Sequence, residues 1–245
     1  MLGLNKVLLK ETFCFKKFKI DQERCAMKIG TDGVLLGAWS HVSSNTQSIL
    51  DIGAGTGLIA LMLAQRSNAE VIDAIEIDED AYEQCVGNFE ASDWSDRLFC
   101  YHAGLDEFVN EIGETYDLIV SNPPFYSEVV TSGSDTRDMA RQNISLPFHD
   151  LLEGVSKLLS VRGLFVTIIP YKEEGSFLNL AQQNGLNPKR IMRVRGNPNA
   201  PLKRTLIEFG FAKVNHVEEE LTIELKRHEY TLEYQQLTKE FYLKM

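Results

Sequence analysis

Short apolar runs alternate along the chain with longer stretches in which apolar residues recur every three or four positions. The apolar runs predict strands, and the recurring positions predict helices that bury one face. We expect strands over residues 48–52, 71–77, 98–101, 116–120 and 163–169. Helices are expected over 57–66, 78–89, 146–159 and 174–184. Two further strand-like runs, 191–195 and 205–212, have no obvious helix between them.

The order of these elements indicates an α/β fold. Strands that alternate with helices form a parallel sheet with helices on both faces, so we expect a doubly wound, mostly parallel sheet. A Gly-Asn-Pro-Asn loop at 196–199 joins the last two strands, which predicts a C-terminal antiparallel hairpin at one edge. Residues 131–147 are polar and have no clear period, which is typical of a mobile loop over a site.

Composition narrows the class of protein. With 245 residues, 44% of them hydrophobic and 24% charged, the chain has the size and make-up of one ordinary globular domain. Its apolar runs are too short to span a membrane and its start lacks a cleavage site, so we expect a cytoplasmic protein. The four cysteines lack CxxC spacing and are expected to be reduced structural thiols, and no metal site is expected.

An Asn-Pro-Pro-Phe sequence directly follows the strand expected over 116–120. The side-chain carbonyl of Asn122 and the backbone carbonyl of Pro123 can accept both hydrogens of one planar NH₂ group. Pro124 makes a second consecutive proline that stiffens the turn, and Phe125 offers a flat face for a base. The alternative is a tight structural turn. The motif predicts catalytic residues that hold an amino group beside an activated methyl.

A glycine-rich loop follows the strand over 48–52. Asp51 precedes Gly53, Gly55 and Gly57, and glycines before a helix let the backbone and its free N–H groups approach a ligand closely. The GxGxG spacing differs from the GxGxxG that seats a pyrophosphate. The Asp51 carboxylate would repel a diphosphate but can bind an amino group, such as that of a methionine moiety.

A carboxylate at the end of the next strand completes this predicted cofactor site. Glu76 lies where an acidic side chain of a doubly wound sheet can accept both hydroxyls of a ribose. Asp78 is the second candidate for that role. The alternative is a solvated carboxylate at the mouth of a loop.

Basic residues are concentrated in two groups, although the net charge of −10 argues against non-specific affinity for nucleic acid. Basic side chains with nearby aromatic rings suit an RNA whose loop bases are splayed and stacked. The first group could instead be a solvated hairpin edge, and the phenylalanines near the second (Phe13, Phe15 and Phe18) could be core. The first group is Lys189, Arg190, Arg193, Arg195, Lys203 and Arg204, and the second is Lys16, Lys17, Lys19, Arg24 and Lys28.

Two smaller charged features complete the sequence picture. Arg137 and Arg141, in the expected loop, are candidates to meet the RNA backbone, although lone loop arginines are usually just solvated. The acidic stretch Glu218 to Glu220 is expected to face solvent away from RNA.

Together these residues resemble the class I S-adenosylmethionine-dependent methyltransferases. More narrowly, the chain resembles the bacterial tRNA1(Val) N6-adenine methyltransferases, which modify adenosine 37, immediately 3′ of the anticodon. The resemblance implies S-adenosylmethionine as cofactor, a seven-stranded sheet and the anticodon stem-loop of tRNA as partner. It also implies a methyltransferase domain over 47–245 and a segment over 1–46 that packs on the cofactor site. The matching segments are 15–18, 24–39, 51–57, 76–78, 122–125 and 241–243.

The resemblance assigns further residues and leaves alternatives open. A turn of Lys28, Gly30, Thr31, Asp32 and Gly33 would close over the methionine end of the cofactor. Where the family usually has an Asp for the cofactor adenine this chain has Gly104, so Asp106 or backbone groups would take that role. The same motif also serves methylation of guanine N2 in ribosomal RNA, of DNA adenine and of protein glutamine. A non-enzymatic nucleotide-binding module is the remaining alternative.

Overall fold

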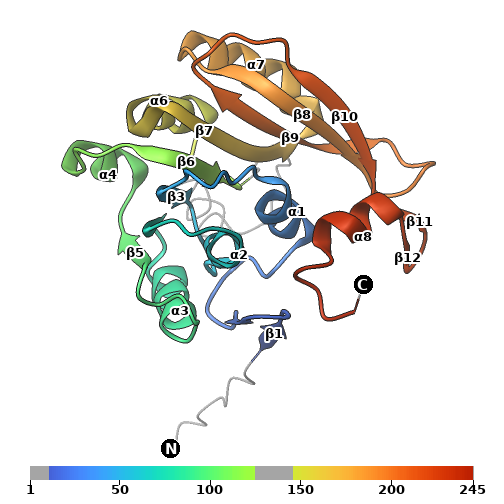
Figure 1. Ribbon diagram of the computed structural model, residues 1–245, viewed down its shortest axis with the longest axis horizontal. Helices are drawn as coiled ribbons and strands as arrows, with labels where there is room; N and C mark the ends of the chain where they lie inside the picture. The colour runs from blue at the N-terminus through green and yellow to red at the C-terminus, as the bar shows by residue number, and fades with distance from the viewer. Residues whose placement is uncertain (1–10, 125–145, 245) are drawn as a thin grey trace, which may run out of the picture.

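An eight-stranded sheet forms the centre of the structure (Figure 1). The computed structural model describes residues 11–124 and 146–244. The strand order is β10-β8-β9-β7-β6-β3-β4-β5, in which β9 runs antiparallel to β7 and β8 and all other neighbours are parallel. The strands are β3 (Ser48–Ile52), β4 (Val71–Glu76), β5 (Leu98–His102), β6 (Tyr116–Ser121), β7 (Leu159–Pro170), β8 (Asn187–Arg195), β9 (Leu202–Gly210) and β10 (Val217–Thr222). The expected doubly wound fold and its antiparallel hairpin are confirmed. The hairpin was expected at the edge of the sheet, but β10 pairs with β8 and forms the edge, which gives one strand more than the expected seven.

Helices cover both faces of the sheet. Apolar residues of α1, α2, α3 and α8 join one core cluster, and those of α4, α6 and α7 join the other. The helices are α1 (Thr31–Trp39), α2 (Leu58–Arg66), α3 (Glu79–Glu90), α4 (Leu105–Glu111), α6 (Phe148–Leu158), α7 (Glu174–Gln183) and α8 (Leu232–Thr238), with a 3₁₀ turn η1 (Tyr171–Glu173). Two small hairpins, β1 (Thr12–Cys14) with β2 (Lys19–Asp21) and β11 (Glu224–Lys226) with β12 (Glu229–Tyr230), lie outside the main sheet.

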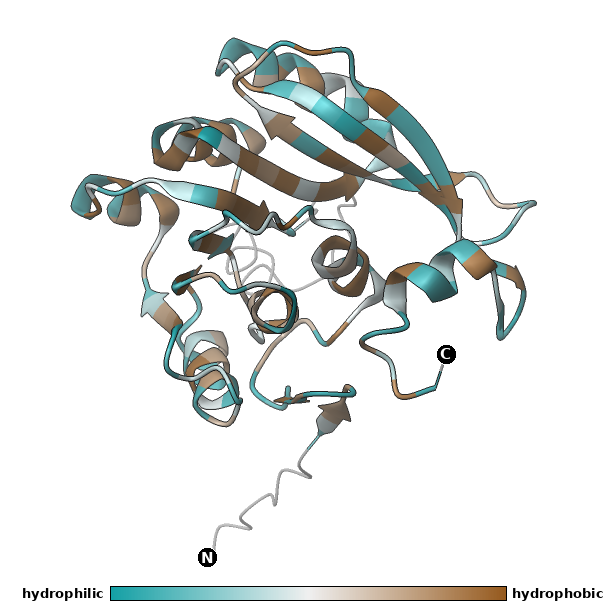
Figure 2. Cartoon of the chain, viewed as in Figure 1, coloured by the Kyte–Doolittle hydropathy of each residue, from teal (hydrophilic) through white to brown (hydrophobic). Residues whose placement is uncertain are grey.

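The central strands are apolar on both faces, as strands between two helical layers must be. In β3, Ile49 belongs to one core cluster while Leu50 and Ile52 belong to the other. The same alternation occurs in β6, where Leu118 and Ile119 face opposite clusters. The brown colour of the central strands in Figure 2 follows from this two-sided burial. No helix in the described part of the chain is long and apolar enough to cross a membrane.

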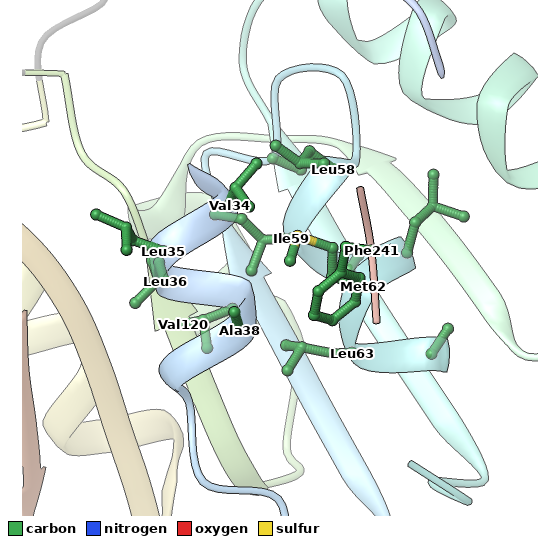
Figure 3. Packing of buried hydrophobic residues seen from close by; sticks show 14 of the residues in the cluster. Val34, Leu35, Leu36, Ala38, Leu58, Ile59, Met62, Leu63, Val120 and Phe241 are labelled. Carbon is green, nitrogen blue, oxygen red and sulfur yellow. The ribbon is translucent and has the colours of Figure 1, made fainter. Parts of the chain in front are cut away.

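Helix α1 is the main element that the hydrophobic pattern missed. Its residues 33–39 are all buried, so the helix has no polar face to mark its period. A Cβ on Gly33 would lie 3.0 Å from Leu58 Cδ2 and one on Gly37 would lie 2.7 Å from Met62 Sδ, so the two glycines let α1 approach α2 closely. Figure 3 shows the packed side chains of these helices. The expected turn over 28–33 is therefore only partly a turn, because the helix already begins at Thr31.

The N-terminal phenylalanines are structural. Phe15 and Phe18 are buried, their rings stack with centroids 4.7 Å apart, and Phe15 also bridges to Tyr242 near the C-terminus. Between them, Lys16 donates to the carbonyl of Lys239. These two phenylalanines therefore belong to the core, which was the alternative to a role in RNA binding.

Asn88 of α3 attaches the N-terminal segment to the glycine-rich loop. Its Nδ2 donates to the carbonyls of Asp21 and Thr56, both at 2.9 Å, and its Oδ1 accepts from the N–H of Asp21. One buried side chain therefore joins the residue before the Gln22–Gly30 connection to the loop that follows β3.

Gly57 is a packing residue with a backbone conformation that favours glycine. Its φ is +78°, and an added Cβ would lie 2.5 Å from Phe89 Cε1 and 2.9 Å from Cys85 Sγ. Gly57→Ala is expected to lower the free energy of unfolding by about 2–4 kcal/mol, from left-handed strain and overpacking. Gly87→Ala is the matched control, because an added Cβ at this position in α3 meets nothing within 4 Å. Urea unfolding checks both, and equal effects of the two substitutions would contradict the packing argument.

Candidate functional site

The glycine-rich loop is held at the carboxyl end of β3 by the neighbouring strand. The N–H groups of Gly53 and Ala54 donate to the carbonyl of Ile75, at 2.9 and 3.1 Å. Gly53 and Gly55 have φ of +74° and +56°, and a Cβ added to either would meet no atom within 4 Å. These two glycines therefore present bare backbone to open space, which is a cradle for a ligand.

Glu76 lies at the end of β4 and ties this loop to the start of α3. The residue is 8% exposed, and its Oε2 accepts from Gly55 N at 2.8 Å while its Oε1 accepts from Asp78 N at 2.9 Å. Asp78 is the N-cap of α3 and accepts from Ala81 N through its own carboxylate. Each oxygen of Glu76 keeps a free lone pair for a ligand hydroxyl, so the site fits a ribose.

Two adjacent cavities open at this end of the sheet, with volumes of about 780 and 580 Å³. The first contains three of the five acidic residues predicted for the cofactor, Glu76, Asp78 and Asp106. The second contains all five residues of the expected 28–33 turn and three of the basic residues, Arg195, Lys203 and Arg204. Six residues line both cavities: Met27, Gly53, Gly55, Asn122, Pro123 and Pro124. The Asn-Pro-Pro turn thus stands at the boundary between them.

The end of β6 places Asn122 at this boundary. Ser121 pairs with Ile52 in the β3–β6 register, and its buried hydroxyl donates to the Ile52 carbonyl at 2.9 Å. The Oδ1 atom of Asn122 is buried and has no hydrogen-bond partner among the described residues. Burying a carbonyl oxygen without a hydrogen-bond donor costs free energy unless a ligand supplies the donor. This oxygen can therefore accept a hydrogen bond from a ligand N–H group.

Asp51 lies beneath the glycine-rich loop and lines neither cavity. It is 0% exposed, its Oδ2 accepts from Ala60 N at 3.1 Å, and its Oδ1 has no partner within the described chain. Burial raises the pKa of Asp51 to about 7, aided by the charge of Glu76 and opposed by the Ala60 hydrogen bond. In this structure Asp51 therefore supports the first turn of α2.

The raised pKa of Asp51 makes the stability of the protein depend on pH. The folded state holds the Asp51 proton up to about pH 7, whereas the unfolded chain releases it near pH 4. The contribution of Asp51 to the free energy of unfolding is therefore full below about pH 4 and falls as pH rises to 7. The Asp51→Asn variant is expected to lack this pH dependence. The free energy of unfolding of the wild type, taken relative to that of the variant, therefore decreases from pH 5 to 8. Urea unfolding across that range measures it, and parallel curves would contradict it.

Asp106 occupies space that Gly104 leaves open. Both residues line the first cavity, and a Cβ added to Gly104 would lie 2.8 Å from Asp106 Oδ1. Gly104 is the N-cap of α4, and Asp106 lies in the first turn of that helix. The carboxylate predicted for adenine recognition therefore lies in the cavity where Glu76 lies.

The structure adds residues that the sequence did not single out. Met27 lines both cavities and is 63% exposed, and the buried Cys25 lines the first. Burial raises the pKa of the Cys25 thiol to about 12, so it is an inert wall and not a nucleophile. The hydrophobic periodicity of the sequence could not identify Met27, because an exposed apolar residue in a loop belongs to no periodic pattern. All four cysteines are unbridged, as expected.

The basic residues predicted for RNA are spread unevenly around the site. Arg195, Lys203 and Arg204 line the second cavity, whereas Lys16 and Lys17 line neither. Arg190 lies over the Trp39 ring at 4.2 Å and pairs with Glu208 at 2.7 Å, which is a structural role. Arg204 pairs with Asp32 at 2.7 Å, within the second cavity. Phe125, Arg137 and Arg141, and most of the loop expected over 131–147, lie outside the described residues.

The fold and the site together define an S-adenosylmethionine-dependent methyltransferase. A family model described as the methyltransferase small domain matches residues 29–145. A predicted O-methyltransferase from Agrobacterium tumefaciens has the same fold, with a TM-score of 0.67 and 18% identity over 86% of this chain and 96% of that chain.

Curated relatives narrow the family. A protein of Christiangramia forsetii is 58% identical over 96% of this chain and 99% of its own length. A protein of Flavobacterium johnsoniae is 58% identical over 95% of this chain and 100% of its own length, and one of Pectobacterium carotovorum is 42% identical over 98% of each. All three are named tRNA1(Val) (adenine(37)-N6)-methyltransferase. The chain belongs to this family of methyltransferases.

Proposed function

We propose that the protein transfers a methyl group from S-adenosylmethionine to the exocyclic N6 of adenosine 37 in tRNA1(Val). The observation that carries this proposal is the buried Oδ1 of Asn122, which has no hydrogen-bond partner within residues 11–124 and 146–244 and lies at the boundary of the two cavities. This carbonyl oxygen can accept a hydrogen bond from a planar amino group, and methyl transfer to such a group needs no strong base. The identity of the nucleotide and of the tRNA is taken from the names of the relatives above, because the geometry alone does not specify them.

The first cavity is the proposed cofactor site. Glu76 would accept the ribose hydroxyls, Asp106 would face the adenine, and Gly53 and Gly55 would lie against the ligand where the two cavities meet. The bound cofactor supplies a methyl group on a positively charged sulfur. Residues 11–46 would form part of an N-terminal segment that closes over this site, since Cys25, Ala26 and Met27 line the first cavity.

The second cavity is the proposed site of the target adenine. The 28–33 turn, which also lines it, would close over the methionine end of the cofactor where the two cavities meet. The lone pair of an exocyclic adenine nitrogen is delocalised into the ring, so the free amino group is a poor nucleophile. Asn122 Oδ1 and the Pro123 carbonyl would each accept one hydrogen of that amino group, which returns electron density to the nitrogen. The proton becomes acidic once the methyl has been transferred, so the chain contributes positioning and electrostatic stabilisation. The adenine would leave its neighbours in the anticodon loop to enter the cavity.

Nucleoside analysis of the methylated product tests the proposal. Labelled S-adenosylmethionine is incubated with separate pools of unmodified tRNA, ribosomal RNA, DNA and protein, and the nucleosides are identified by mass spectrometry. The expected result is N6-methyladenosine at position 37 of the valine tRNA, with loss of label in Asn122→Ala. Label in another pool would keep the amino-methylating site and overturn the tRNA assignment.

A further inference from the structure

The arginines of β8 have two kinds of carboxylate partner. Arg193 forms a bidentate pair with Glu174, with Nη2–Oε1 at 2.6 Å and Nε–Oε2 at 2.9 Å. The Glu174 side chain is 12% exposed and also accepts from Thr205 at 2.8 Å, so this pair belongs to the fold. The second partner of Arg193 is Glu218, whose side chain is 47% exposed, at 2.7 Å. Arg195 pairs in the same way with the exposed Glu220.

Both exposed carboxylates come from β10, the edge strand of the sheet. This strand runs parallel to β8, with Glu218 beside Ile191 and Glu220 beside Arg193. Because side chains alternate along a strand, Glu218 and Glu220 point to one face and Glu219 to the other. The acidic stretch was expected to face solvent, and its three glutamates are exposed. Two of their carboxylates also pair with Arg193 and Arg195.

The paired row of charges leads into the second cavity. Arg195 lines that cavity with Lys203, for which no ion pair is present among the described residues, and the Asn-Pro-Pro turn lines the same cavity. Arg193 lies two residues before Arg195 on the same face of β8. A polyanion whose base enters the cavity would therefore run along this row.

We propose that Glu218 and Glu220 hold the places that RNA phosphates take on Arg193 and Arg195, so that β10 competes with the RNA backbone for these arginines. This inference rests on the proposed function and identifies the surface that receives the phosphates. Exposed ion pairs contribute little to stability, so a phosphate can replace the carboxylate without loss of the fold. Arginine binds phosphate through two parallel hydrogen bonds, and the Glu174 pair keeps Arg193 in position during the exchange.

The competition has a consequence for selectivity. An unpaired arginine row would attract any polyanion, because phosphate binding is driven by counterion release and carries no sequence information. With the carboxylates in place, only an RNA that also gains contacts in the second cavity displaces both. Arg193 and then His216 hold the pKa of Glu218 below its ordinary value, so this carboxylate is charged at neutral pH.

A matched pair of variants on one strand tests the inference. In the double variant Glu218→Gln/Glu220→Gln the arginines lose their exposed partners, whereas Glu219→Gln removes a charge from the same strand on its other face. Filter binding of unmodified tRNA across a salt series is expected to show about 10-fold tighter binding and a steeper salt dependence for the double variant. Glu219→Gln is expected to bind as the wild type does.

Glu219→Gln removes one charge and the double variant removes two. Two results would therefore overturn the inference: a change in binding free energy in Glu219→Gln of half that in the double variant or more, which indicates bulk charge, and unchanged or weaker binding by the double variant. Thermal unfolding of the double variant confirms that it is folded before binding is measured. Methyl transfer by the wild type into the same tRNA is recorded in parallel. Label in tRNA without tightening by the double variant overturns only this inference, whereas absence of label in tRNA overturns the proposed function itself.

Discussion

Asn122→Ala is expected to lower the turnover number at least ~100-fold, the loss associated with removing one preorganised polar contact from a site. In the proposed mechanism, alanine leaves the amino group of the target with one acceptor, the Pro123 carbonyl, in place of two. Asn122 Oδ1 has no hydrogen-bond partner among the described residues, so its removal breaks no hydrogen bond of the described fold. Single-turnover kinetics at saturating cofactor and tRNA measure the chemical step directly.

Two controls separate this loss from damage to the site. The affinity for S-adenosylhomocysteine is expected to stay within about twofold, because Glu76 and the glycine-rich loop are the residues proposed to hold the cofactor. Asn122→Asp keeps an acceptor oxygen at the same place and is expected to retain more activity than alanine. Near-normal turnover of Asn122→Ala would remove this side chain from the mechanism.

Glu76→Ala is expected to weaken cofactor binding by roughly 10–100-fold, the effect of losing hydrogen bonds to a charged group. The substitution removes the proposed ribose acceptor and also leaves the N–H groups of Gly55 and Asp78 without their present partner. Both the contact and the shape of the loop are therefore lost. Calorimetric titration with S-adenosylhomocysteine measures the change in the dissociation constant.

Glu79→Gln is the matched control for this prediction. It removes one negative charge three residues away at the exposed start of α3, and the affinity is expected to be unchanged. An equal loss in both variants would indicate a general electrostatic effect, and no loss in Glu76→Ala would place the ribose elsewhere in the cavity.

The sequence by itself determined the central sheet and the position of the Asn-Pro-Pro turn. Strands buried on both faces are short apolar runs that need no tertiary context to be recognised, and β3 spans the residues expected for it. The Asn-Pro-Pro turn and the glycine-rich loop depend on local backbone chemistry, namely missing N–H groups and positive φ, so their residues identify them directly. The predicted α/β fold, cofactor and enzyme class are accordingly confirmed.

Only the tertiary structure decided how these local features act together. Helix α1 has no periodic pattern because α2 and the sheet bury it all round, and β10 has no apolar pattern because the partners of its Glu218 and Glu220 are arginines of β8. The sequence does not show which group a carboxylate contacts. Asp51 was therefore predicted to contact the ligand, whereas in the structure it is buried beneath the loop. Contacts between distant parts of the chain also place Arg190 on the Trp39 ring. The same fold brings Arg195 and Lys203 to the second cavity. These outcomes depend on contacts between residues far apart in the chain, which local composition does not encode.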